Sequence, residues 1–148
     1  MKEVDYQKLV RTYLSSIPLT SFTTKSGKII QIISPGVINV NEGPDFLDFA
    51  IMLNGKVIVG DAEFHVNAAD WISHNHSTNK NYENVILHIV FEDNSELTNP
   101  DILILEREKI LETDSLPSAE NIASYEEIQH FALLRLLRKS SMAQKNIN

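Results

Sequence analysis

The fold is decided by residues 41–93, which read NEGPDFLDFAIMLNGKVIVGDAEFHVNAADWISHNHSTNKNYENVILHIVFED. A run at 46–53 and a strand-like segment at 56–66 flank Asn54-Gly55, the dipeptide most typical of a two-residue hairpin turn. The apolar run 84–91 predicts a buried strand. Between them, residues 67–83 are polar and irregular, with a short helix expected near 68–72. This stretch therefore predicts a hairpin, an irregular crossover and a buried strand.

The flanking segments complete a mixed α/β pattern. Residues 4–14 place apolar side chains at helical spacing, and Pro18 closes that helix. The β-branched run at 28–33 and the segment 101–105 predict further strands, and the pattern from Ser118 onward is helical. We therefore expect a single α/β domain over residues 1–148, with a mixed central sheet flanked by helices.

Composition restricts the class of protein. A hydrophobic content of 43% and a charged content of 22% fit a globular domain, and no apolar run is long enough to cross a bilayer. The charged N-terminus does not resemble a signal peptide, so we expect a cytoplasmic protein with no membrane partner. With no cysteine, any metal must bind Asp, Glu, His or backbone oxygen. The net charge of −7 argues against a protein that coats nucleic-acid phosphates, but acidic residues gathered around a metal leave a nucleic-acid enzyme open.

Polar side chains gather on the strand at 56–66. Side chains alternate along a strand, so Asp61, Glu63 and His65 share one face. The Asn54-Gly55 turn brings Asp45, in the tripeptide Gly-Pro-Asp, toward Glu63. Two such carboxylates suit Mg²⁺ or Mn²⁺. The alternatives are a solvated strand end and a turn in which the aspartate caps backbone groups.

Histidines supply further candidate groups. His74 and His76 form a His-x-His pair that can chelate a metal, but the pair alone is a weak signal, and a polar loop with Trp71 anchored in the core is the more common origin of such a pattern. Asp70 lies just before this pair and is expected to line the site. His88 sits inside the apolar run, where a buried imidazole needs a partner. It is therefore either a satisfied core histidine or a group beside the site.

These motifs together resemble an uncharacterised bacterial family, domain of unknown function 2851. The resemblance rests on Gly43 to Phe46, Glu63 with His65, Asp70-Trp71, His74 with His76, and Tyr82 with the strand that contains His88. Members of that family are typically longer. The resemblance therefore implies that this chain is the N-terminal part, or a shortened version, of such a protein. We expect a homodimer if apolar surface is left uncovered.

The element order and the two carboxylates also resemble the PD-(D/E)XK nuclease-like superfamily, with its restriction-endonuclease-like αβββαβ core. The resemblance implies Asp45 and Glu63 as catalytic metal ligands and places His65 where that superfamily has lysine. A nuclease-like phosphodiester hydrolase acting on nucleic acid, with Mg²⁺ or Mn²⁺ ahead of Zn²⁺, is the expectation. Two alternatives stay open: a non-catalytic nucleic-acid or protein binding module, and a zinc metalloprotein using histidines with Glu63.

Overall fold

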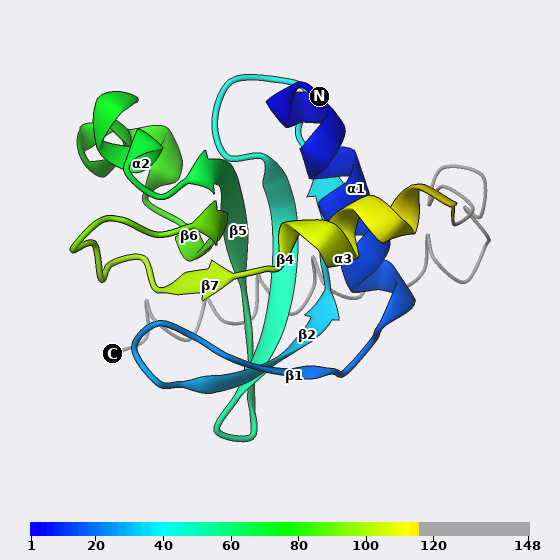
Figure 1. Ribbon diagram of the computed structural model, residues 1–148. Helices are drawn as coiled ribbons and strands as arrows, with labels where there is room; N and C mark the ends of the chain where they lie inside the picture. The colour runs from blue at the N-terminus through cyan, green and yellow to red at the C-terminus, as the bar shows by residue number, and fades with distance from the viewer. Residues whose placement is uncertain (116–148) are drawn as a thin grey trace.

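The computed structural model describes residues 1–115, and at its centre lies a seven-stranded mixed sheet (Figure 1). The strands follow the order β1-β2-β4-β5-β6-β7, and β3 also pairs with β4. The strands are β1 (Ser21–Thr23), β2 (Ile29–Ser34), β3 (Val37–Ile38), β4 (Phe46–Leu53), β5 (Lys56–Asn67), β6 (Val85–Glu92) and β7 (Ile102–Ile104). The helices are α1 (Glu3–Ser16), α2 (Asp70–Ser73) and α3 (Arg107–Glu112), with 3-10 turns η1 (His76–Thr78), η2 (Lys80–Tyr82) and η3 (Thr113–Ser115).

The sequence predictions for the central elements are confirmed. The helix expected at 4–14 is α1, and the expected strands correspond to β2, β4, β5, β6 and β7. The mixed α/β class with helices beside a central sheet is also confirmed. Short elements β1, β3 and α3 were not expected. The helix predicted from Ser118 onward lies outside the described residues. Within residues 1–115, no helix is long and apolar enough to span a membrane.

The β4–β5 hairpin has the register that the turn predicts. Asn54 and Gly55 both have positive φ, 52° and 75°, as a type I′ turn requires, and Leu53 pairs with Lys56. At the far end of the hairpin, Phe46 pairs with Ala62. A bulge at Asp48, whose φ is 59°, interrupts the pairing between Phe46 and Phe49. Asp45 therefore enters β4 next to the part of β5 that carries Glu63.

A parallel pair follows the hairpin. β6 runs parallel to β5, with Glu63 opposite His88, and β7 runs parallel to β6. Parallel neighbours need a crossover, and here the segment holding α2, η1 and η2 makes that connection (Figure 1). The crossover leaves the end of β5 and so passes close to the polar face of that strand.

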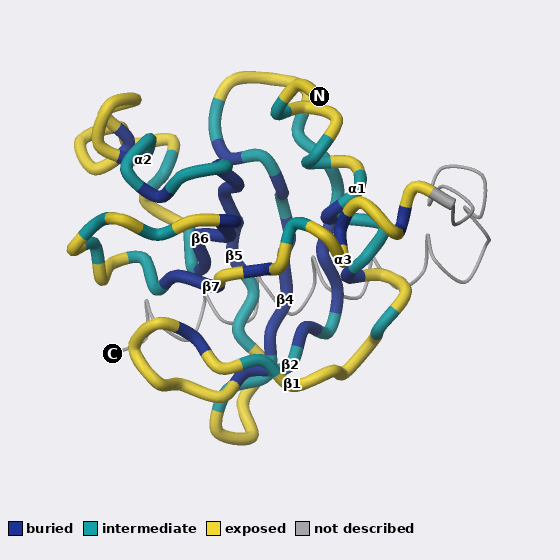
Figure 2. Tube along the Cα trace, viewed as in Figure 1, coloured by how far each residue is buried: buried dark blue, intermediate teal, exposed yellow. Residues whose placement is uncertain are grey.

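The two faces of the sheet differ in chemistry. One face packs against α1 and α3, and the buried residues of the strands and helices are dark blue along the trace in Figure 2. Val10 from α1, Ile110 from α3 and Phe64 from β5 belong to this core. Alternation along β5 and β6 turns Glu63, His65 and His88 away from it. The core thus fixes the position of the polar residues on the opposite face.

Candidate metal site

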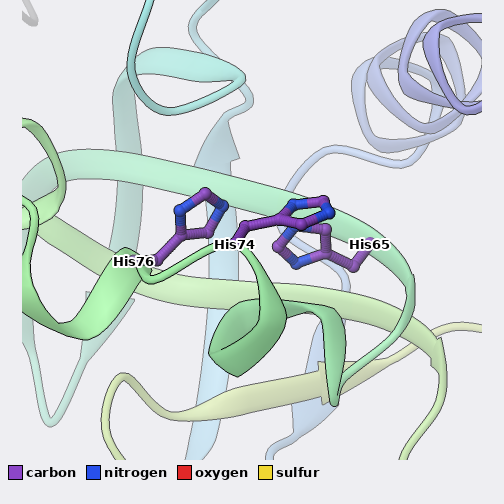
Figure 3. A group of neighbouring side chains, drawn as sticks. All are labelled: His65, His74 and His76. Atoms are coloured by element: carbon purple, nitrogen blue, oxygen red, sulfur yellow. The ribbon is translucent and has the colours of Figure 1, made fainter.

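Three histidines from two segments meet beside β5 (Figure 3). His65 comes from β5, His74 follows α2, and His76 begins η1. One ring nitrogen from each lies within 4.8 Å of the others, so this group can bind a metal ion. His65 and His76 are buried and His74 is exposed, which leaves one side of the group open to solvent.

Local structure holds the His-x-His segment in place. Trp71 is buried, and its indole N–H donates to Ser77 Oγ at 2.9 Å. Asn75, between the two histidines, has a left-handed backbone with φ of 56°, a conformation that asparagine tolerates. The Tyr82 ring stacks on His76 with centroids 3.8 Å apart, and its hydroxyl donates to Gly43 O at 3.1 Å. The anchored Trp71 and the histidine group are therefore both present, although the sequence offered them as alternatives.

Glu63 connects the histidines to Asp45. Its Oε2 lies 2.6 Å from His76 Nε2 and 3.6 Å from His65 Nε2, and its Oε1 accepts the Asp45 backbone N–H at 3.1 Å. Asp45 Oδ2 in turn accepts the Phe64 N–H at 2.9 Å, and its Oδ1 accepts from Gln7 Nε2 at 2.9 Å. The approach of Asp45 to Glu63 that the hairpin predicts is confirmed.

Burial sets the protonation of the two carboxyl groups. It raises the pKa of Glu63 to about 10, with the hydrogen bond and the charge of Asp45 acting in the same direction. Burial also raises the pKa of Asp45. The two carboxyl groups are hydrogen-bonded to each other, so in the absence of a metal they share a proton near neutral pH.

Burial has the opposite effect on the histidines. It lowers the pKa of His65 to about 3, with nearby His88 adding to the effect, and it lowers the pKa of His76 to about 4. Both rings are therefore neutral at pH 7, and each keeps a nitrogen lone pair. Neutral imidazole is the form that binds metal ions.

His76 is a buried ring whose nitrogens make no hydrogen bond of acceptable geometry. Glu63 Oε2 is near Nε2 but does not lie along a ring N–H direction. Buried polar groups without partners are rare, and an ion is one of the accepted explanations. Around a tetrahedral zinc ion, neighbouring donors are roughly 3.3 Å apart, a spacing that small side-chain movements would produce from the observed group. The residues therefore fit a metal ion.

The other predicted residues occupy different positions. His88 is buried, and its Nε2 lies 2.9 Å from His65 Nδ1, so it is behind a candidate ligand instead of within the metal-binding group. Asp61 is also buried on β5 but does not belong to that group, and an irregularity in the β5–β6 pairing follows it. Asp70 begins α2 and interacts electrostatically with Glu3.

Sequence reasoning missed two contributors from α1. Gln7 holds Asp45, and Glu3 interacts with both Asp45 and His74. These two polar residues are four apart in a helix and therefore share a face, which is the signal that could have identified them. The packing of α1 against the sheet, which brings that face to Asp45, is not visible in the sequence.

The fold and the histidine group define a mixed α/β domain with a site able to bind a metal ion. Residues 14–140 match the model of a family described as "Protein of unknown function (DUF2851)". Because this match covers most of the chain, the protein belongs to that family. No curated protein and no solved structure matches it.

Proposed function

We propose that this protein is a metal-dependent phosphodiester hydrolase whose metal is bound by His65, His74 and His76, with Glu63 beside it. The observation that carries the proposal is the convergence of three imidazole nitrogens within 4.8 Å. Glu63 Oε2, which is 2.6 Å from His76 Nε2 and 3.6 Å from His65 Nε2, lies beside this group of histidines. Three protein ligands with an exposed side match the pattern of catalytic zinc sites.

The donor set favours zinc over magnesium. Mg²⁺ prefers oxygen ligands and retains several waters, whereas imidazole suits zinc and other transition metals. The carboxylates Asp45 and Glu63 alone favour Mg²⁺ or Mn²⁺, but the histidines next to them change that balance. We therefore propose zinc as the first choice and manganese as the second.

The substrate class is inferred from the layout of the elements. Helix α1, the antiparallel strands β2, β4 and β5, a crossover and the parallel strand β6 resemble the order of the PD-(D/E)XK nuclease-like core, with the short strands β1 and β3 in addition. Asp45, just before β4, and Glu63 on β5 resemble its paired carboxylates in order and spacing. A bound metal would activate water and stabilise charge on the phosphate. The carboxyl pair of Asp45 and Glu63 would accept the proton of the attacking water.

A non-catalytic binding module is the second candidate. The net charge is −7, and His65 stands where the nuclease-like layout has a lysine. Neutral His65 does not provide the fixed positive charge of lysine near a phosphate. These two features favour a domain that binds a partner through a structural metal without cleaving it.

Cleavage assays can separate the two candidates. The full 148-residue chain is stripped of metal, loaded with Zn²⁺, Mn²⁺ or Mg²⁺ in turn, and incubated with plasmid DNA, single-stranded DNA and RNA. We expect cleavage with zinc or manganese. Glu63→Gln should reduce it by more than the roughly 10- to 100-fold typical of losing an outer-shell partner. Glu92→Gln is the matched control, because Glu92 is exposed at the end of β6, and it should behave like the parent.

Two results would contradict the catalytic proposal. Equal cleavage by the parent and Glu63→Gln would assign the activity to a contaminant or another site. Zinc binding and a gel shift without cleavage would instead support the binding module. Elemental analysis of the purified chain identifies the bound metal in either case.

A further inference from the structure

His88 contacts the Nδ1 atom of the His65 ring, whereas Glu63 lies nearer to Nε2 of the same ring. The two rings are perpendicular, with an interplanar angle of 89°, and His88 Nε2 is 2.9 Å from His65 Nδ1. Both residues are 1% exposed. Two neutral imidazoles at this distance form one hydrogen bond, in which one ring supplies the proton and the other the lone pair. The contact therefore links the proton positions of the two rings.

The surroundings of His65 favour one of the two arrangements. If His88 donated, the His65 proton would lie on Nε2, where the nearest carboxylate oxygen, Glu63 Oε2, is 3.6 Å away. That distance is too long for a hydrogen bond, and the proton would occupy the nitrogen lone pair that a metal beside Glu63 needs. If His65 donates from Nδ1, both nitrogens of the contact are satisfied and Nε2 keeps its lone pair. In this second arrangement His88 carries its own proton on Nδ1, and His65 is left able to bind a metal through Nε2.

We propose that His88 is a positioning residue that holds His65 in the tautomer with a free Nε2 lone pair directed at the metal. This inference rests on the metal site proposed above. Ligand histidines commonly donate their second ring nitrogen to a carboxylate, carbonyl or water, and here a neutral imidazole has that role. The contact was not assigned from the sequence, because it depends on the parallel pairing of β5 with β6.

The position of His88 is well defined by its strand. β6 is flanked by β5 and β7, and the His88 backbone N–H donates to Asp101 O at 2.9 Å. The Trp71 ring lies 5.1 Å from the His88 ring, between centroids, and limits its rotation from the crossover side. An acceptor held this firmly can orient His65 before any metal arrives.

Nitrogen-15 NMR of the imidazole side chains tests the tautomer in the full chain without metal. We expect the His65 proton on Nδ1 in the parent, with its signals assigned by comparison with His65→Gln. His88→Gln should preserve this tautomer, because the glutamine oxygen can accept a hydrogen bond near the original Nε2 position. His88→Leu removes the acceptor and should give a mixture of tautomers.

Metal binding provides the second measurement. Titration with Co²⁺, followed by its visible absorption, should show a 10- to 100-fold weaker affinity and an altered spectrum for His88→Leu. His88→Gln should stay within a few-fold of the parent. Ile89→Ala is the matched control: Ile89 is the next residue of β6, is buried, and belongs to the hydrophobic core on the face opposite the histidines. It should lower stability without changing the Co²⁺ spectrum.

A proton on Nε2 of His65 in the metal-free parent would overturn the inference, as would parent-like Co²⁺ affinity and tautomer in His88→Leu. If His88→Leu does not fold, the parent tautomer and the His88→Gln titration decide the question. If the parent binds no Co²⁺ or Zn²⁺, the proposed function fails, while the metal-free tautomer still reports separately on His88.

Discussion

At the scale of single residues, His76 lowers the stability of the metal-free protein but is well suited to bind a metal. Its ring is buried and stacked on Tyr82, yet neither nitrogen makes a hydrogen bond of acceptable geometry. Leaving a buried polar group unsatisfied costs about 1–3 kcal/mol. A side chain that only had to fill this space would be apolar. The imidazole is better explained by a ligand that satisfies it.

Replacing His76 by leucine separates the two effects. We expect His76→Leu to raise the free energy of unfolding of the metal-free protein by about 1 kcal/mol, because the unsatisfied polar group is removed. The same variant should lose the stabilisation by zinc, which for the parent is about 2.7 kcal/mol at 100 times the dissociation constant. Urea denaturation with EDTA and with Zn²⁺ measures both.

Thr78→Ala, at an exposed position of the same 3-10 turn, is the control and should keep the zinc response. If the leucine variant gains as much stability from zinc as the parent does, His76 is not a ligand.

At the scale of elements, the sequence predicts the structure correctly where one local signal, such as a turn dipeptide or strand alternation, is strong. Asn54-Gly55 determined the hairpin register, and that register placed Asp45 beside Glu63. Strand alternation correctly put Glu63 and His65 on the face opposite Phe64. The meeting of His74 and His76 with His65 could not be derived, because it depends on the path of the irregular crossover. Short elements such as β3 form only against neighbours that the local sequence does not reveal.

The contact between Gly36 and β4 shows how closely these elements approach. Gly36 has φ of 68°, and a Cβ there would clash with the backbone oxygen of Leu47. Gly36→Ala should therefore destabilise the protein by at least about 3 kcal/mol, since both strain and a backbone clash arise. Gly27→Ala is the matched control: its φ is also positive, at 86°, but no atom lies within 4 Å of the added Cβ.

We expect Gly27→Ala to lose only about 1–2 kcal/mol, the strain of a left-handed backbone. Urea denaturation of both variants compares the two values. Similar losses would mean that β3 and β4 can separate at Gly36 without disturbing the rest of the sheet.

At the scale of the whole molecule, the site is assembled from three separate parts. Gln7 on α1 holds Asp45, the β4–β5 hairpin supplies Glu63 and His65, and the crossover supplies His74 and His76. The hydrophobic core on the other face of the sheet fixes α1 relative to β5. Metal binding at the site therefore depends on folding of the whole domain. The stability of the fold depends in turn on the protonation of the site residues.

The direction of the pH dependence follows from the pKa shifts. The pKa of Glu63 is raised to about 10 by burial, so folding favours its protonated form, and that stabilisation is lost as pH rises above about 4.5 toward 10. The pKa values of His65, His76 and His88 are lowered to about 3, 4 and 4, so their contribution is lost as pH falls below about 6.5. The metal-free protein should be most stable at about pH 6–7.

A bound metal should change only one side of this profile. The cation takes the place of the proton shared by Asp45 and Glu63, so the alkaline decline should disappear in the zinc-loaded protein. Urea denaturation at pH 5, 6.5 and 8.5, with EDTA or Zn²⁺, measures the acidic and the alkaline side of the stability profile for both the metal-free and the zinc-loaded protein. Glu63→Gln has no carboxyl proton to lose, and its metal-free form should show a weaker decline above pH 6.5, because the Asp45 pKa is also raised. If the stability of the metal-free parent instead rose steadily to pH 8.5, the carboxyl pair of Asp45 and Glu63 would be ionised in the folded state. The pair would then already have a counter-charge other than a metal.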